Sequence, residues 1–115
     1  MGDINVWIGK GRLARDIDLK FTDSGVALAK FSLAILEIWY KENQKQTKTI
    51  FVAVEVWGKK AESCAKYLQT GSQVVVEGKL ESNNYEDRNE NKRTHWFIKA
   101  KDVHFISDGQ NRSQE

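Results

Sequence analysis

The chain has 115 residues, a formal net charge of +2 and a single cysteine. This length provides one modest hydrophobic core, so we expect one domain. A lone cysteine excludes an internal disulfide and fits a reducing cytoplasm, where we expect the protein to reside. No apolar run has membrane-spanning length, and no signal peptide is evident, so we expect no membrane contact. The small positive charge permits a polyanionic ligand without requiring one.

The N-terminal part of the chain predicts a long first β-strand over residues 4–21. Gly9 and Gly11 are expected to interrupt this strand, because glycine within a strand marks a bulge or a close backbone approach. The strand ends at residues 22–25, Thr-Asp-Ser-Gly, which have the composition of a turn.

A second strand is predicted over residues 26–39, where apolar and polar residues alternate at first. The alternation is lost at Leu36 and Ile38, which leaves the direction of the Trp39 side chain open. The polar residues 41–48 are predicted to form a loop to the next strand.

The third predicted strand, residues 49–57, has two unlike faces. One face carries the branched aliphatic side chains, and these are Ile50, Val52, Val54 and Val56. Phe51 and Trp57 therefore fall on the other face, which water or a ligand would contact. The two rings stand roughly 20 Å apart, a spacing that suits separate planar groups of one long ligand such as a nucleic acid strand. The alternative is that a neighbouring loop or subunit covers both rings.

A short amphipathic helix follows Gly58. Its apolar stripe has helical spacing and consists of Ala61, Cys64, Ala65 and Leu68. Gly71 is the expected C-terminal cap, and Cys64 is expected to lie in the core rather than to act as a reactive thiol.

Two further strands complete the predicted domain. They cover residues 73–85 and 94–106, and the polar residues 86–93 are expected to form a long exposed hairpin loop between them. Residues 107–115 contain no apolar side chain and are expected to form a disordered tail. The domain would thus occupy residues 1–106.

Five strands with one helix between the third and fourth are typical of an all-β, five-stranded OB-fold Greek-key barrel. Specific residues add a resemblance, and the strongest stretches are Gly11-Arg-Leu-Ala-Arg-Asp16, Phe31-Ser-Leu-Ala34, Trp57-Gly-Lys-Lys-Ala-Glu62, Tyr67-Leu68 with Gly71-Ser72, and Val76-Glu-Gly-Lys-Leu80 leading to Tyr85-Glu-Asp87. In this order and spacing, residues 4–106 resemble the DNA-binding domain of the bacterial single-stranded-DNA-binding proteins.

This resemblance implies sequence-nonspecific binding of single-stranded DNA during replication, recombination and repair. It places the base-stacking side chains at Trp39, Phe51, Trp57 and Tyr85. Basic residues expected beside the path of the phosphates are Arg12, Arg15, Lys41, Lys48, Lys59, Lys79, Arg88, Lys92 and Arg93. Stacking tolerates any sequence because every base has a π-face.

The other two tryptophans are interpreted as packing residues, because Trp7 alternates with Val6 and Ile8, and Trp96 shares its face with Ile98 and Ala100. Three positions depart from the family: Gly9 and Lys10 replace apolar residues of the first strand, and Ile17 replaces a common proline. The resemblance implies a homo-oligomer, most simply a homotetramer, whose subunits pair through that first strand.

Catalysis is not predicted. His95 and His104 have no metal-site or catalytic-triad pattern around them, so we expect no metal, no cofactor and no enzymatic activity. The alternative function is a protein-assembly module of the primosome-accessory type, in which nucleic-acid binding is secondary. Members of the family usually end in an acidic tip that recruits genome-maintenance proteins, so those partners are expected only where the natural full-length chain carries such a tip.

Overall fold

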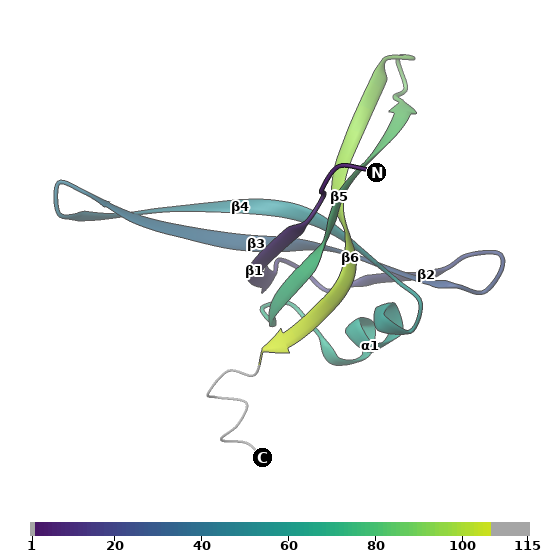
Figure 1. Cartoon of the computed structure of the whole chain (residues 1–115), viewed down its shortest axis with the longest axis horizontal. Coiled ribbons are helices and arrows are strands. Elements are labelled where there is room, and N and C mark those ends of the chain that lie inside the picture. Colours follow the sequence, from purple (N-terminus) through teal and green to yellow (C-terminus); the bar gives the residue numbers. More distant parts are fainter. Residues whose placement is uncertain (1, 107–115) are drawn as a thin grey trace.

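The computed structural model describes residues 2–106, and the predicted tail at 107–115 lies outside the described residues. The elements in chain order are β1 Trp7–Leu13, β2 Asp18–Phe21, β3 Ala27–Lys41, β4 Gln44–Trp57, α1 Lys59–Tyr67, β5 Gln73–Glu86 and β6 Lys92–Ile106. Figure 1 shows a central barrel from which two long two-stranded arms project, one formed by β3 and β4 and the other by β5 and β6. In residues 2–106 no helix has the length and apolar character needed to cross a membrane.

The sheet closes into a barrel through β1. The strand order is β1-β5-β6-β4-β3-β2, and β1 also pairs with β3, where Arg12 lies opposite Ala34. A short parallel contact, in which Val54 lies beside Ile98, joins β4 to β6. With β1 and β2 taken as two pieces of one interrupted strand, this is the predicted five-stranded barrel with one short helix.

The interruption of the first strand lies at residues 14–17, so the prediction that Gly9 and Gly11 break it was wrong. Both glycines are in regular strand and serve close packing. A Cβ atom at Gly9 would overlap the indole of Trp7, and one at Gly11 would overlap the backbone carbonyl oxygen of Ala34. The glycines that looked like breaks in the sequence therefore allow the first strand to fit into the barrel.

Of the two polar segments predicted to be loops, residues 41–48 are mostly strand, whereas residues 86–93 keep a loop at their centre. β3 and β4 continue to a two-residue turn at Glu42 and Asn43, whose φ angles of 53° and 65° match a type I′ hairpin. β5 and β6 leave residues 87–91 between them, so the predicted hairpin loop is confirmed there and only its flanks are strand. The prediction for residues 41–48 was wrong because, beyond the barrel, both faces of a two-stranded arm are in water, so the strands carry no apolar alternation to reveal them.

The core lies inside the barrel and under α1. Its buried residues are Leu13, Ala27, Ala29, Phe31, Leu33, Val54, Val56, Ala61, Cys64, Leu68, Val74, Val76 and Ile98. Cys64 is buried as predicted, and desolvation together with the negative charge of Asp102 raises its thiol pKa to about 11. The helix ends at Tyr67 because Leu68 adopts an extended conformation that directs it into the core. Gly71, at φ 89°, belongs to the following turn and is not the helix cap that was predicted.

The two tryptophans interpreted as packing residues differ. Trp7 is partly buried and packs against the core, as predicted. Trp96 is 60% exposed, so its interpretation was wrong for this chain. The face of β6 that is buried at Ile98 continues along the arm to Trp96, but there the barrel has ended and no second layer covers it.

Candidate nucleic-acid interface

The outer face of β4 presents two aromatic rings to solvent. Phe51 is 65% exposed and Trp57 is 38% exposed, while Val54 and Val56 are buried on the inner face. The sequence prediction of an aromatic, wet face is therefore confirmed. This face is one continuous surface with the outer face of β3, because residues directly opposite in an antiparallel pair share a face.

The register between β3 and β4 explains why the surface between the rings is open. Phe51 lies opposite Ala34, and the next outward pair is Ser32 with Ala53. On the side that faces Trp57, these small side chains leave the Phe51 ring uncovered. Ligand groups can therefore reach the ring from the solvent side.

A cleft of about 280 Å³ opens beside this face. Its walls come from the β1–β2 connection and from β2, β3, β4 and β6, and the lining residues are Arg15, Asp16, Asp18, Lys30, Phe31, Ser32, Ala53, Val54, Glu55 and His95. A row of alternating charge crosses it, because Lys30 lies opposite Asp18 on one side and opposite Glu55 on the other. The cleft is therefore polar, in contrast to the rings at its side.

Asp16 anchors the rim of this cleft. Its Oδ1 accepts hydrogen bonds from the hydroxyl of Thr70, at 2.7 Å, and from the backbone N–H of Thr70, at 2.8 Å. Both bonds favour the carboxylate and lower the pKa of Asp16 from 3.8. The contact ties the β1–β2 connection to the turn that precedes β5, which holds the neighbouring Arg15 at the cleft.

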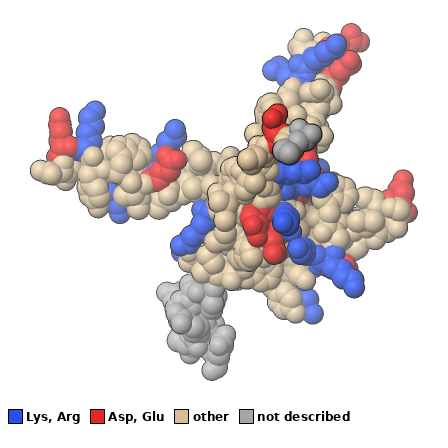
Figure 2. Space-filling view, viewed as in Figure 1, with Lys and Arg blue, Asp and Glu red and all other residues tan. Residues whose placement is uncertain are grey.

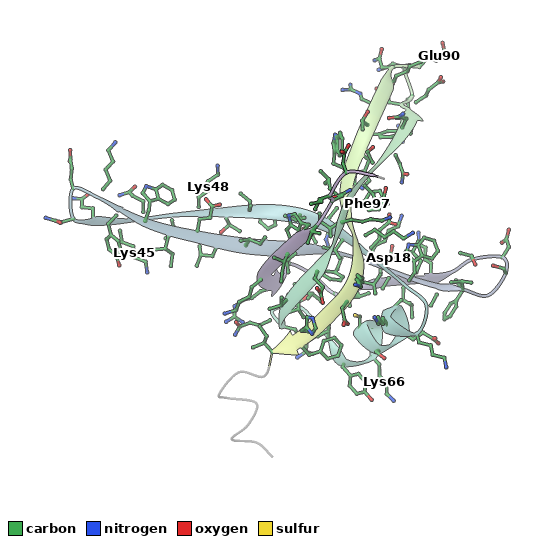
Figure 3. All side chains as sticks on the ribbon, viewed as in Figure 1. Asp18, Lys45, Lys48, Lys66, Glu90 and Phe97 are labelled. Atoms are coloured by element: carbon green, nitrogen blue, oxygen red, sulfur yellow. The ribbon has the colours of Figure 1, made fainter. Side chains whose placement is uncertain are left out.

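The outer face continues from the cleft onto the β5–β6 arm. His95 lines the cleft and stacks on Phe97 with ring centroids 5.7 Å apart, close to the point where the two arms meet (Figure 3). Tyr85 lies opposite Arg93 and shares the face of His95, one two-residue step, or about 7 Å, further along the arm. The exposed Tyr85 ring thus stands on a surface that leads directly into the cleft.

Trp39 is exposed, but the structure does not bring it to the face of Phe51 and Trp57. Trp39 lies opposite Gln46. This pair is on the same face of the two strands as Ile35 and Ile50, whose side chains point toward the inside of the barrel. The direction that the sequence left open is therefore settled by the register. A strand of DNA that contacts both Trp39 and Phe51 has to cross from one face of the β3–β4 arm to the other.

Tyr40 is the aromatic residue that sequence analysis missed. It is exposed and shares the outer face with Phe51 and Trp57. On β3, the position opposite Phe51 is Ala34, and Tyr40 lies six residues beyond it. The position opposite Trp57 is Leu28, six residues from Ala34 in the other direction. The three rings are therefore spaced at intervals of roughly 20 Å along one surface. Continuous pairing up to the turn would have revealed Tyr40, but residues 41–48 were taken for a loop.

Three of the nine basic residues predicted to follow the phosphates are held by partners within the chain. Arg12 donates to the carbonyl oxygen of Gly71 at 2.9 Å, Lys79 lies 3.2 Å from Glu81, and Arg93 lies 3.0 Å from Asp87. In the described part of the chain, the other six form no ion pair, and these are Arg15, Lys41, Lys48, Lys59, Arg88 and Lys92.

Basic side chains are distributed over both arms and the barrel, interleaved with acidic ones (Figure 2). Lys45 and Lys48 lie on opposite sides of the β3–β4 arm (Figure 3). Lys45 shares the face of Tyr40, and Lys30 lies on the outer face within the cleft. Sequence analysis did not select Lys30 or Lys45, since an isolated lysine in a strand carries no signal of its surroundings.

One group of potential metal ligands lies on β5 and β6, outside the cleft. The ligand atoms of Glu77, Asp102 and His104 lie within 4.8 Å of one another. Glu77 is 3.1 Å from the imidazole Nε2 of His104, and Asp102 is 3.7 Å from the ammonium of Lys60. These partners account for the cluster as a network of polar contacts.

Known proteins share this architecture. The family model described as the Single-strand binding protein family matches residues 4–106. A solved structure described as "Plasmodium falciparum SSB complex with ssDNA" is similar with a TM-score of 0.83 and 25% identity, covering 93% of this chain and 98% of that chain. This likeness extends over the barrel and both arms.

Curated relatives are more similar in sequence. Single-stranded DNA-binding protein 3 of Clostridium acetobutylicum is 37% identical over 86% of this chain and 68% of its own length. The Single-stranded DNA-binding protein of Borreliella burgdorferi is 36% identical over 99% of this chain and 77% of its own length. For Single-stranded DNA-binding protein 3 of Listeria innocua, the identity is 38% over 88% of this chain and 62% of the relative. The chain thus spans between 62% and 77% of these three relatives.

Proposed function

Because this chain belongs to the single-strand binding protein family, we propose that it binds single-stranded DNA without sequence preference and protects it during replication, recombination and repair. The resemblance seen in the sequence is confirmed by the family match and by the curated relatives. The function is non-catalytic and belongs in the bacterial cytoplasm, where such DNA is exposed. Assays for nuclease and ATPase activity should read blank.

The observation that carries this proposal is the pair of exposed rings, Phe51 and Trp57, beside a polar cleft on one strand face. Each base stacked on an aromatic side chain contributes about 1–3 kcal/mol, and lysine and arginine side chains add sequence-independent attraction to the phosphates. Bases in a duplex are covered by their neighbours and cannot offer their faces to these rings. The surface therefore selects single strands.

Trp39 and Tyr85 extend the proposed path in two directions. Tyr85 continues it along the β5–β6 arm, and Trp39 continues it on the reverse side of the β3–β4 arm. Tyr40 adds a further ring on the outer face. Binding along both arms means that the strand wraps the molecule instead of crossing it once.

A titration tests the proposal. Oligo(dT) added to the protein should quench tryptophan fluorescence, with an affinity orders of magnitude above that for duplex of the same length. The logarithm of the affinity should fall linearly with the logarithm of the salt concentration, because bound phosphates release counterions. Equal affinity for duplex and single strand would contradict the proposal.

We further expect a homo-oligomer, most simply a homotetramer, built through β1. Residues 7–11 of β1 pair with β5 along one edge, and β1 meets β3 only at residues 12 and 13. In the described part of the chain, the second edge of residues 7–11 therefore carries no strand, and Val6 and Ile8 are exposed beside it. A second copy of β1 could extend the sheet there and cover this apolar surface. A monomeric mass in sedimentation at micromolar concentration would count against this assembly.

A further inference from the structure

Glu55 is an unusual residue for a surface that binds a polyanion. It lies on the outer face of β4, two residues from Trp57, and is only 9% exposed. The nearest cationic atom is Nζ of Lys30, 4.0 Å from Oε2, which is beyond hydrogen-bonding distance. Within residues 2–106 every fully buried side-chain polar atom has a hydrogen-bond partner. The Glu55 oxygens accept no such bond, so they open into the cleft.

A carboxylate in this setting favours a ligand that brings hydrogen-bond donors. Removing a carboxylate from bulk water without supplying donors costs free energy, and a ligand N–H that enters the cleft offsets that cost. The cleft also disfavours the alternative ligand group, a phosphate. Three carboxylates, those of Asp16, Asp18 and Glu55, line it against the two cations of Arg15 and Lys30. The cleft therefore disfavours a phosphate anion but accepts the neutral edge of a base.

The edges of the four bases differ in what they offer a carboxylate. Cytosine and adenine present an exocyclic amino group, and guanine presents an amino group beside a ring N–H. Thymine presents a single ring N–H between two carbonyl oxygens, which a carboxylate repels. An acceptor-only side chain thus discriminates against thymine.

We propose that the cleft at Glu55 receives the edge of one base of the bound strand and that the carboxylate favours bases with an amino group over thymine. This inference rests on the proposed function, since it assumes a single strand stacked on Phe51 and Trp57. It adds a modest base preference to otherwise sequence-tolerant stacking. Glu55 is then a specificity-determining residue, and the stacking rings supply most of the affinity.

The experiment measures the affinity of oligo(dT) and oligo(dC) of equal length, at a slightly alkaline pH where cytosine is unprotonated. The variant is Glu55→Gln, whose amide offers a donor as well as an acceptor and so also accepts thymine. Gain of one net hydrogen bond to thymine should shift the dT-to-dC affinity ratio toward dT by about 5-fold. The matched control is Glu62→Gln on the exposed side of α1, which changes the net charge equally and should leave the ratio unchanged.

The outcomes separate the two proposals. If Glu55→Gln strengthens binding of both strands by the same factor, Glu55 acts through its charge alone; if it alters neither affinity, Glu55 has no part in binding. Either result overturns the inference. If the unaltered protein binds neither strand, the proposed function itself fails. Should thermal melting show that Glu55→Gln is unfolded, Glu55→Asp decides. That variant keeps the charge but withdraws the acceptor, so the ratio should still move toward dT, and an unchanged ratio would overturn the inference.

Discussion

At the scale of single residues, alternation along a strand predicted exposure well wherever the strand lies on the barrel. Phe51 and Trp57 stand outward because their neighbours Val54 and Val56 fill the core. The same rule failed at Trp96, which lies on the same face of β6 as the buried Ile98 but on an arm without a second layer. Alternation thus assigns a side chain to a face of the strand, and its burial depends on what covers that face.

The stacking role of the aromatic residues can be tested one ring at a time. Trp57→Ala and Trp39→Ala should each fold nearly normally and weaken oligo(dT) binding by about 1–3 kcal/mol, because each removes one stacking platform. Both variants should also lose part of the fluorescence quenching on binding. Should they instead leave DNA binding intact and disrupt assembly, the protein-assembly alternative would take precedence.

The exposure of Trp96 reverses the expectation that its packing role implied. A buried tryptophan replaced by alanine costs about 3–5 kcal/mol, whereas an exposed side chain costs about 0.5 kcal/mol or less. Trp96→Ala should therefore melt close to the unaltered protein, and Trp7→Ala, which removes a partly buried ring packed on the core, should melt earlier. Thermal unfolding of the two variants side by side makes the comparison. An early-melting Trp96→Ala would mean that a second copy of the chain buries this ring.

At the scale of elements, the two arms depend on their turns. The turn between β5 and β6 is organised by Asp87, which accepts hydrogen bonds from the backbone N–H groups of Asn89 and Asn91 and from Nε of Arg93. The bond from Asn91, followed by that from Arg93, lowers the pKa of Asp87 from 3.8. The carboxylate replaces the turn signal that glycine or proline usually provides.

This turn and the Asp16 contact predict a definite response to acid. Because the folded pKa of each carboxyl lies below 3.8, the stabilisation is fully present above that value and is lost as pH falls through the lower folded pKa. Asp16→Asn combined with Asp87→Asn should be less stable at neutral pH and should lose less stability on acidification. Urea unfolding across the acidic range measures both effects. An unchanged acid response in the double variant would rule out these two carboxylates as its source.

At the scale of the whole molecule, the barrel depends on close backbone contacts that only glycine permits. Gly11 lets β1 approach the backbone of β3 where the barrel closes, and Gly78 lies against the carbonyl oxygen of Lys99 at the irregularity between β5 and β6. In both cases the obstructing atom belongs to the backbone of a paired strand. It cannot move aside as a flexible side chain does.

Gly11→Ala tests this closure. Replacing glycine stabilises a protein by about 0.4–1 kcal/mol where the space is open, through the unfolded state, but forced overpacking costs about 1–3 kcal/mol. Because the added Cβ collides with the Ala34 carbonyl oxygen, overpacking should outweigh the gain, and Gly11→Ala should have a lower free energy of unfolding. Gly2→Ala is the matched control, because no atom lies within 4 Å of the added Cβ there. Equal stability of both variants, measured by urea unfolding, would show that β1 can shift to relieve the contact.

The sequence by itself determined the barrel, its helix, the buried thiol of Cys64 and the outward rings of Phe51 and Trp57. Backbone geometry sets a period of two in strands and of 3.6 in helices, and the apolar side chains that must leave water make that period visible in the sequence. Only the tertiary structure decided the rest. Regular pairing up to a two-residue turn decided which of the neighbours Trp39 and Tyr40 lies on the face of Phe51, and the polar flanks of that turn carry no periodic signal. Glu55, Lys30 and His95 were brought to one cleft by pairing between strands far apart in the chain, and no local pattern encodes a contact of that kind.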